Sequence, residues 1–279
     1  ITYTYNSVVI TKSHLAEIIL RKLQLATLLG FSLVQASSYS EQLNIGVTDH
    51  CPVVCIEPNK APHGLAISVL HKAFASSEYQ LSFVSLPFLR SESQVKSGKL
   101  DAIASKSFFE DDNILWPSRY RILTKACAYT PTGSSWRYNP ENTTNLNDIK
   151  YGLIKFYDNS KVDQQYPKNI VYLHPGENAV EYRMLKMIAS HRLDAGFLSQ
   201  ITTDYLIQKH GLSASVKSSG CGTKIYETSI ALFAHNPNAT LYQQRIDAAY
   251  QDLRVNGDFL ALMKSYNLHQ KVIDLNINH

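Results

Sequence analysis

The sequence predicts an α/β fold of two similar lobes, each a mainly parallel sheet covered by helices. A Leu-Asp-Ala phrase leading into a short apolar stretch that ends in serine occurs twice, over residues 100–105 and 193–199. Each copy follows an amphipathic helical stretch, and an apolar strand without alternation is typical of a sheet buried on both faces. Strands and helical stretches alternate from residue 43 to residue 217, as they do in βαβ units. Two similar lobes indicate a cleft between them.

The first lobe is predicted from strands that alternate with two helical stretches. Apolar residues recur at near-helical spacing over 65–75, which predicts a helix there. Gly98 is placed to end a shorter helix in a left-handed conformation. The last strand leads into a segment, 130–147, whose proline, glycine and asparagine content marks a linker. We predict strands over 43–47, 80–86, 100–105 and 122–129, and helices over 65–75 and 91–96.

The second lobe repeats the alternation, and helices follow it. Residues 218–222 are expected to form a flexible joint because they are serine, glycine and cysteine. Asn238 is expected to cap a long amphipathic helix, which the Asn-Gly pair at 256–257 ends. A last helix is expected over 258–266, and residues 267–279 are expected to be unstructured. We predict the other strands over 151–156, 170–173, 194–198, 214–217 and 228–234, and the other helices over 177–189 and 201–209.

Composition and charge exclude several classes of function. The 279 residues carry 27 basic and 23 acidic side chains, a net charge of +4, without a block of like charges. A nucleic-acid partner is therefore not expected. The sequence contains no Gly-x-Ser-x-Gly, no phosphate-binding Gly-x-x-x-x-Gly-Lys-Ser/Thr and no His-Glu-x-x-His motif. We predict neither a catalytic residue nor a cofactor.

The first 36 residues have the pattern of a secretory signal. Arg21 and Lys22 precede an apolar run over 23–34, and small residues end at Ala36, where cleavage is expected. The run is too short to cross a bilayer, which needs about 20 apolar residues. Residues 1–19 are interpreted as an upstream extension of this signal. The alternative interpretation of this segment is an amphipathic anchor helix. A secretory signal predicts export to the periplasm.

Export favours disulfides among the four cysteines. Three pairings are open. Cys51 with Cys55 is the local choice, and Cys127 with Cys221 is the long-range one. His50 and His63 flank the first two cysteines, but no second Cys or His pair completes a tetrahedral metal site, so none is predicted.

Candidate ligand-binding residues follow the predicted strands, because ligands of open α/β sheets bind beyond the carboxyl ends of the strands. Phe108 and Tyr157 offer flat faces to an apolar or cyclic ligand, and helix starts near Ser160 and Glu177 offer free amides to an anionic group. Each candidate has an alternative structural role as a turn or helix-cap residue. The candidates are Asp49, His50, Ser105, Ser107, Phe108, Tyr157, Asp158, Asn159, Ser160, Glu177, Asn178, Ser199 and Gln200.

Four other residues have a structural interpretation beside the functional one. Arg90 and Glu110 are further ligand candidates, but an arginine at a helix start also forms salt links, and acidic residues there complement the helix dipole. Asp101 and Asp194 precede their strands and lie away from the predicted cleft. We expect both to fix turns by accepting hydrogen bonds from nearby amides.

Several of these segments together resemble the bacterial extracellular solute-binding proteins of family 3, the periplasmic amino-acid-binding proteins of transporters. The resemblance implies the type II periplasmic binding fold, with lobe 1 built from residues 37–128 and 226–268, lobe 2 from 129–225, and a flexible tail over 269–279. It also implies two crossing strands as a hinge, and Cys127 with Cys221 as a disulfide of that hinge. The matching segments are 43–47, 64–67, 87–90, 97–102, 147–152, 192–195 and 254–259.

The resemblance implies a monomeric binder of a small polar ligand that serves an ABC-type transporter, through its permease, or a sensor kinase. Family members that bind amino acids usually clamp the ligand carboxylate with an arginine where this chain has Phe108–Asp112, and hold the amino group with an aspartate where it has Ser199. We therefore predict a ligand other than an ordinary α-amino acid. The alternatives are a cyclohexadienyl dehydratase-like enzyme on the same scaffold and a ligand-sensing module.

Overall fold

The computed structural model describes residues 41–107, 111–142, 146–155, 169–174 and 180–278. The expected secretory signal over 1–36 lies outside these ranges. Within them, no helix combines the length and the apolar character needed to cross a membrane.

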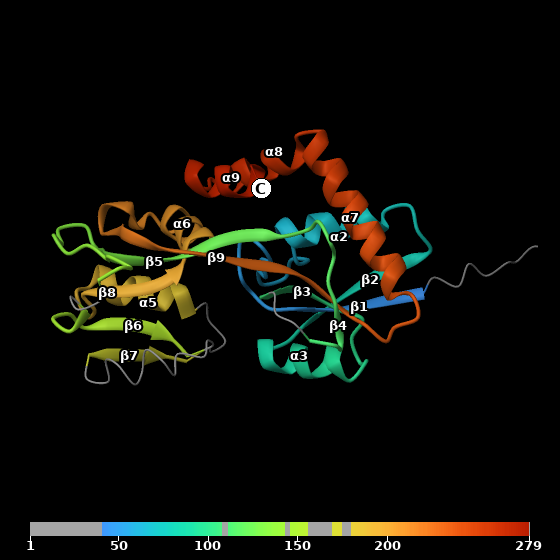
Figure 1. The fold of residues 1–279 in the computed structure, drawn as a ribbon, viewed down its shortest axis with the longest axis horizontal. Coiled ribbons are helices and arrows are strands. Elements are labelled where there is room, and N and C mark those ends of the chain that lie inside the picture. The colour runs from blue at the N-terminus through green and yellow to red at the C-terminus, as the bar shows by residue number, and fades with distance from the viewer. Residues whose placement is uncertain (1–40, 108–110, 143–145, 156–168, 175–179, 279) are drawn as a thin grey trace, which may run out of the picture. The chain divides into compact units, whose positions relative to one another are not determined.

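The described strands form one sheet of two parallel parts joined by two long antiparallel strands (Figure 1). The order is β2-β1-β3-β9-β5-β8-β6-β7, with β4 paired to β9. β1 pairs in parallel with β2 and β3, and β6 pairs in parallel with β7 and β8. This arrangement confirms the predicted fold class. The strands are β1 (Glu41–Val47), β2 (Tyr79–Ser85), β3 (Ala102–Ser107), β4 (Ile114–Leu115), β5 (Ile122–Pro131), β6 (Tyr151–Ile154), β7 (Ile170–Leu173), β8 (Ala195–Ser199) and β9 (Val216–Phe233).

Helices cover both parts of the sheet, and each part has its own core. The first lobe contains β1–β3 with α2, α3, α7, α8 and α9; the second contains β6–β8 with α5 and α6. Phe74 of α2 meets Tyr242 of α7 edge to face at 5.7 Å in the first core, and Met184 of α5 is fully buried in the second. The helices are α2 (Leu65–Phe74), α3 (Phe88–Lys96), α5 (Val180–Ala189), α6 (Gln200–Lys209), α7 (Ala239–Val255), α8 (Asp258–Ser265) and α9 (Gln270–Ile277).

The two aspartates of the repeated phrase perform the same task in the two lobes. The Asp101 carboxylate accepts a hydrogen bond from the Asn44 amide at 2.8 Å, and the Asp101 amide donates back to the Asn44 carbonyl at 2.9 Å. The Asp194 carboxylate and amide form the same pair of bonds with Lys150, both at 2.8 Å. Each aspartate thereby fixes the turn before its strand against the start of the neighbouring parallel strand, which confirms the predicted structural role.

The crossing strands correct the prediction of a flexible joint at 218–222 and of separate strands over 214–217 and 228–234. β9 is continuous through these residues and is paired with β5, whereas 212–214 form a short 3₁₀ helix. Gly220 has φ 130°, and a Cβ there would lie 2.6 Å from the Tyr138 carbonyl oxygen. Glycine is therefore needed at this position, where two backbone segments approach closely. The pairing with β5 supplies the hydrogen bonds that hold a serine- and glycine-rich segment extended.

The structure contains two disulfides, one local and one long-range. Cys51 is bonded to Cys55, and Cys127 is bonded to Cys221. Cys127 and Cys221 are also register partners in the β5–β9 ladder. The second disulfide therefore links the two strands that cross between the lobes.

The C-terminal segment corrects the prediction of an unstructured tail over 267–279, because residues 270–277 form α9. Val272 and Ile273 are buried in the first core. The Asn276 side chain is 2% exposed; its Oδ1 accepts from the Leu123 amide at 2.8 Å and its Nδ2 donates to the Leu123 carbonyl at 2.9 Å. This part of β5 precedes the residues that pair with β8, so Asn276 takes the place of a neighbouring strand.

Candidate functional site

The loop after β1 is closed by its own contacts. The Cys51–Cys55 disulfide lies in it, and the His50 amide donates to the Val54 carbonyl at 2.7 Å. The Asp49 carboxylate accepts from the Ile56 amide at 3.1 Å and is otherwise exposed. Asp49 thus holds the loop, which is the structural alternative considered for it.

His50 extends from this loop to the second lobe. Its Nε2 lies 3.3 Å from the Thr202 hydroxyl of α6, and its Nδ1 lies 3.8 Å from the Glu181 carboxylate at the start of α5. The side chains of His50 and Glu181 are 25% and 13% exposed. Protonation of His50 makes its contact with Glu181 an ion pair. A residue after the first strand is therefore in contact with two helices of the other lobe.

The start of α6 lies against a crossing strand. The Thr124 hydroxyl of β5 accepts from the Ile201 amide at 3.2 Å and lies 3.1 Å from the Ser199 hydroxyl. Ser199 precedes the helix without capping it through its own side chain, so Thr124 supplies the oxygen that a cap residue usually supplies. Ile201 is buried in the first core although its helix belongs to the second lobe. Ser199 and Gln200 accordingly lie where the two lobes and the crossing strand β5 meet.

The end of β3 brings in a lysine that the sequence analysis missed. A register shift between Ile103 and Lys106 interrupts the pairing with β9. The Lys106 side chain is 1% exposed, its Nζ lies 3.0 Å from the Glu92 carboxylate, and it stands 5.3 Å from the centre of the Phe88 ring. Burial lowers the pKa of Lys106. Its neighbours Ser105 and Ser107 are half-buried and exposed, respectively.

A second set of contacts joins the lobes beside α6. Lys209 Nζ lies 3.3 Å from the Glu57 carboxylate of the loop after β1. Lys60 also pairs with Glu57, at 2.7 Å. The hydrogen bonds from Lys60 and Lys209 lower the pKa of Glu57 to about 2. The Tyr205 ring of α6 meets the Tyr266 ring after α8 at 5.8 Å, so the contact is both ionic and aromatic.

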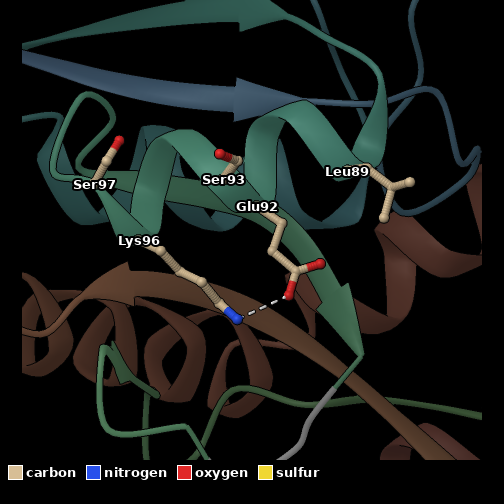
Figure 2. A pocket seen from close by; sticks show the side chains of 5 residues that line it. All are labelled: Leu89, Glu92, Ser93, Lys96 and Ser97. Carbon is tan, nitrogen blue, oxygen red and sulfur yellow. Dashed lines mark ion pairs between the residues drawn. The ribbon is translucent and has the colours of Figure 1, made fainter.

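The acidic turn after β3 is tied to α3. Asp111 pairs with Lys96 at 2.7 Å, and that hydrogen bond lowers the pKa of Asp111 to about 2. Figure 2 shows a surface pocket on this helix, lined by Leu89, Glu92, Ser93, Lys96 and Ser97, with the Lys96–Glu92 ion pair of 3.2 Å inside it. The pocket contains none of the residues singled out as ligand candidates. Arg90 is exposed on the same helix.

The remaining candidates lie outside the described residues: Phe108, Glu110, Tyr157, Asp158, Asn159, Ser160, Glu177 and Asn178. The predicted strand over 151–156 is described as far as Lys155, and the predicted helix over 177–189 from Val180 onward. Of the described candidates, the structure brings His50, Ser199 and Gln200 to the junction of the lobes. Glu181 and Thr202 join them there. Neither was selected from the sequence, because both lie more than 130 positions from His50.

Cys51 and Cys55 do not form a metal site with the histidines that flank them, because their sulfur atoms form a disulfide. Over the described ranges, no three His, Cys, Asp or Glu side chains gather as a metal site requires.

No protein-family model and no curated protein sequence matches this chain. Solved structures do resemble it. A histidine kinase sensor domain with similarity to periplasmic binding proteins has a TM-score of 0.65 at 15% identity, over 82% of this chain and 96% of its own. A Streptococcus pneumoniae ABC transporter substrate-binding protein with bound histidine has a TM-score of 0.64 at 12% identity, over 82% and 94%. A mutant of ArgBP from T. maritima has a TM-score of 0.63 at 14% identity, over 81% and 94%. At these identities the likeness establishes the fold: this chain has that of periplasmic binding proteins.

Proposed function

We propose that this protein is an exported, periplasmic solute-binding protein that captures a small polar ligand between its two lobes. The observation that carries the proposal is the contact of His50 with Thr202 and Glu181, which joins a strand end of one lobe to two helices of the other. Each lobe has a core of its own, although Ile201 of α6 is buried in the first, and two crossing strands connect the lobes. This arrangement supports hinge motion about β5 and β9. Closure is a population shift, which a ligand drives only if it contacts both lobes.

The proposed lobes are those expected from the sequence, residues 37–128 with 226–268 and residues 129–225. We add residues 270–277 to the first lobe, because Val272 and Ile273 of α9 are buried in its core. The proposed ligand contacts combine His50, Ser105 and Ser107 from the first lobe with Ser199 and Gln200 from the second. The candidates outside the described residues remain predictions, and Glu181 is added to the set.

The ligand is proposed to be polar and different from an ordinary α-amino acid. The solved S. pneumoniae protein holds histidine. In this chain the turn after β3 offers Asp111, which is already paired with Lys96, where such proteins usually carry an arginine fork. A carboxylate repels the carboxylate that an arginine would bind bidentately.

The proposal is tested by thermal unfolding of the protein with a panel of amino acids, amines, sugar acids and short peptides. At roughly a hundredfold excess over Kd, a ligand that binds the native state stabilises it by about 2.7 kcal/mol, which raises the midpoint by about 5–10 °C. His50→Ala and Glu181→Gln should reduce that shift, whereas His235→Ala, an exposed histidine away from the junction, should retain it. A panel without any shift, or a shift that both junction variants retain, would contradict the proposal.

Sensing is the second proposed role, favoured by the likeness to a histidine kinase sensor domain. A neighbouring permease gene would support transport, and a neighbouring kinase or cyclase gene would support sensing. We propose binding rather than catalysis; conversion of prephenate or arogenate by the purified protein would contradict this.

A further inference from the structure

Residues of α5 and of the turn after it surround an open surface pocket with cationic side chains. The pocket has a volume of about 590 Å³, which is within the range of small-molecule sites. Three of its lining side chains are cationic, one is a hydroxyl and two are apolar. The lining residues are Arg183, Lys186, Met187, Ala189, Ser190 and Arg192.

The charge of this pocket is unbalanced. Among the described residues, none of Arg183, Lys186 and Arg192 forms an ion pair. Lys186 instead lies 4.9 Å over the ring of Tyr182. The pocket on α3 in Figure 2 is different, because its lysine, Lys96, is neutralised by two carboxylates. An acidic residue one turn away can pair with a cation of a helix, but none pairs with Arg183 or Lys186 of α5, nor with Arg192 after it, among the described residues. The pocket therefore has positive charge that is open to an anionic ligand.

Arg183 provides an independent observation. One terminal nitrogen of its guanidinium donates to the His174 carbonyl, which holds the side chain in place. Its Nε is buried and has no hydrogen-bond partner among the described residues. A buried donor without a partner is unfavourable, so Arg183 is a side chain whose hydrogen bonds the described residues do not complete.

The electrostatic surroundings of the pocket agree with its positive charge. The His210 ring stacks on Tyr182 at 3.9 Å, next to Lys186. Burial lowers the pKa of His210, and the charges of Lys209 and Lys186 lower it further. The acidic residue at the start of the same helix, Glu181, faces His50 instead.

We propose that this pocket binds a phosphate group. Two guanidinium forks match phosphate oxygens bidentately, and a lysine adds a point charge beside them. The volume leaves room for the organic part of a phosphorylated small molecule or for the headgroup of a phospholipid. The site is separate from the proposed ligand site at the lobe junction and does not depend on it.

The test is isothermal titration calorimetry of the full chain with inorganic phosphate and with glucose 6-phosphate, together with sedimentation with phosphatidylglycerol vesicles. The test variant is Lys186→Gln/Arg192→Gln. Both replaced side chains are exposed, and the variant leaves Arg183 unchanged. The matched control is Lys264→Gln/Lys271→Gln, which removes two exposed charges from α8 and α9.

We expect the wild type and the control to bind at least one of the three probes, and the test variant to bind it at least about tenfold more weakly. Binding of the soluble probes assigns the site to a free phosphate compound, whereas binding of vesicles alone assigns it to a lipid headgroup. Absence of binding to all three probes would overturn the proposal. So would equal binding by the test variant and the control.

Discussion

Replacement of Asn276 by alanine tests whether α9 stabilises the crossing strand β5. Asn276 satisfies both the amide and the carbonyl of Leu123 on the edge of β5 that has no neighbouring strand there. The alanine variant leaves two backbone groups without a partner, and each costs about 1–3 kcal/mol where it is buried. Because Leu123 is half-buried, water can form hydrogen bonds with these groups and offset part of the cost. We therefore expect the free energy of unfolding to fall by about 2–4 kcal/mol.

The assay is urea unfolding, followed by far-UV circular dichroism, of Asn276→Ala beside Asn278→Ala. Asn278 is an exposed asparagine two positions later, and its replacement should change the free energy of unfolding by less than about 0.5 kcal/mol. Asn276→Asp keeps the acceptor but loses the donor and buries a charge, so it should also destabilise. Equal stability of Asn276→Ala and Asn278→Ala would refute the role given to α9.

Three further predictions concern the core of the second lobe, the loop after β1 and the disulfide between β5 and β9. Leu193→Asp buries a charge in the second core, where Leu193 is 1% exposed, and should cost about 3 kcal/mol or more in urea unfolding; a soluble variant of wild-type stability would contradict the packing. The pKa of Glu57 lies at about 2 instead of 4.5, so its contacts stabilise the fold above pH 4.5 and are lost as the pH falls towards 2. An NMR titration should show this low midpoint and its rise in Lys60→Gln; a wild-type midpoint near 4.5 would contradict it. Cys127→Ala/Cys221→Ala should lower the free energy of unfolding by about 3–5 kcal/mol, since the disulfide closes a loop of 94 residues; a loss below about 1 kcal/mol would contradict the stabilising role given to this disulfide.

Sequence patterns identified the elements whose structure is decided locally. The aspartates of the repeated phrase were expected to fix turns, and Asp101 and Asp194 do so through equivalent bonds to Asn44 and Lys150. Gly98 has φ 70° after α3, as its position predicts. Local geometry is sufficient for Gly98. The partners of the two aspartates lie 57 and 44 positions earlier in the chain, so the sequence predicted the role of these aspartates but not their partners.

Elements that depend on distant partners were predicted wrongly or missed. The segment 218–222 has the composition of a loop, but pairing with β5 makes it a strand. α9 is short and has a buried polar residue, Asn276, on its inner face, so its apolar pattern is weak; its partner Leu123 lies 153 positions away. Lys106 is missed because only the fold shows that this buried lysine pairs with Glu92, whose side chain is 22% exposed.

The candidate site shows the same limit. Strand ends selected His50 and Ser199 as ligand candidates, because the topology of an open sheet determines where strands end. The structure brings both to the lobe junction, and their contact with a ligand stays a prediction. Asp49 follows the same strand but holds its loop, and Glu181 reaches His50 only through the packing of the two lobes. Chemistry at a junction of lobes depends on contacts that a strand pattern does not encode.

Small-angle X-ray scattering of the protein, with and without the ligand found by thermal unfolding, tests the central claim most directly. Closure of two lobes on a ligand predicts a smaller radius of gyration at saturation in the wild type, and a smaller change in His50→Ala at the same ligand concentration. A radius of gyration that stays constant in the wild type while the ligand is bound would contradict capture by hinge closure.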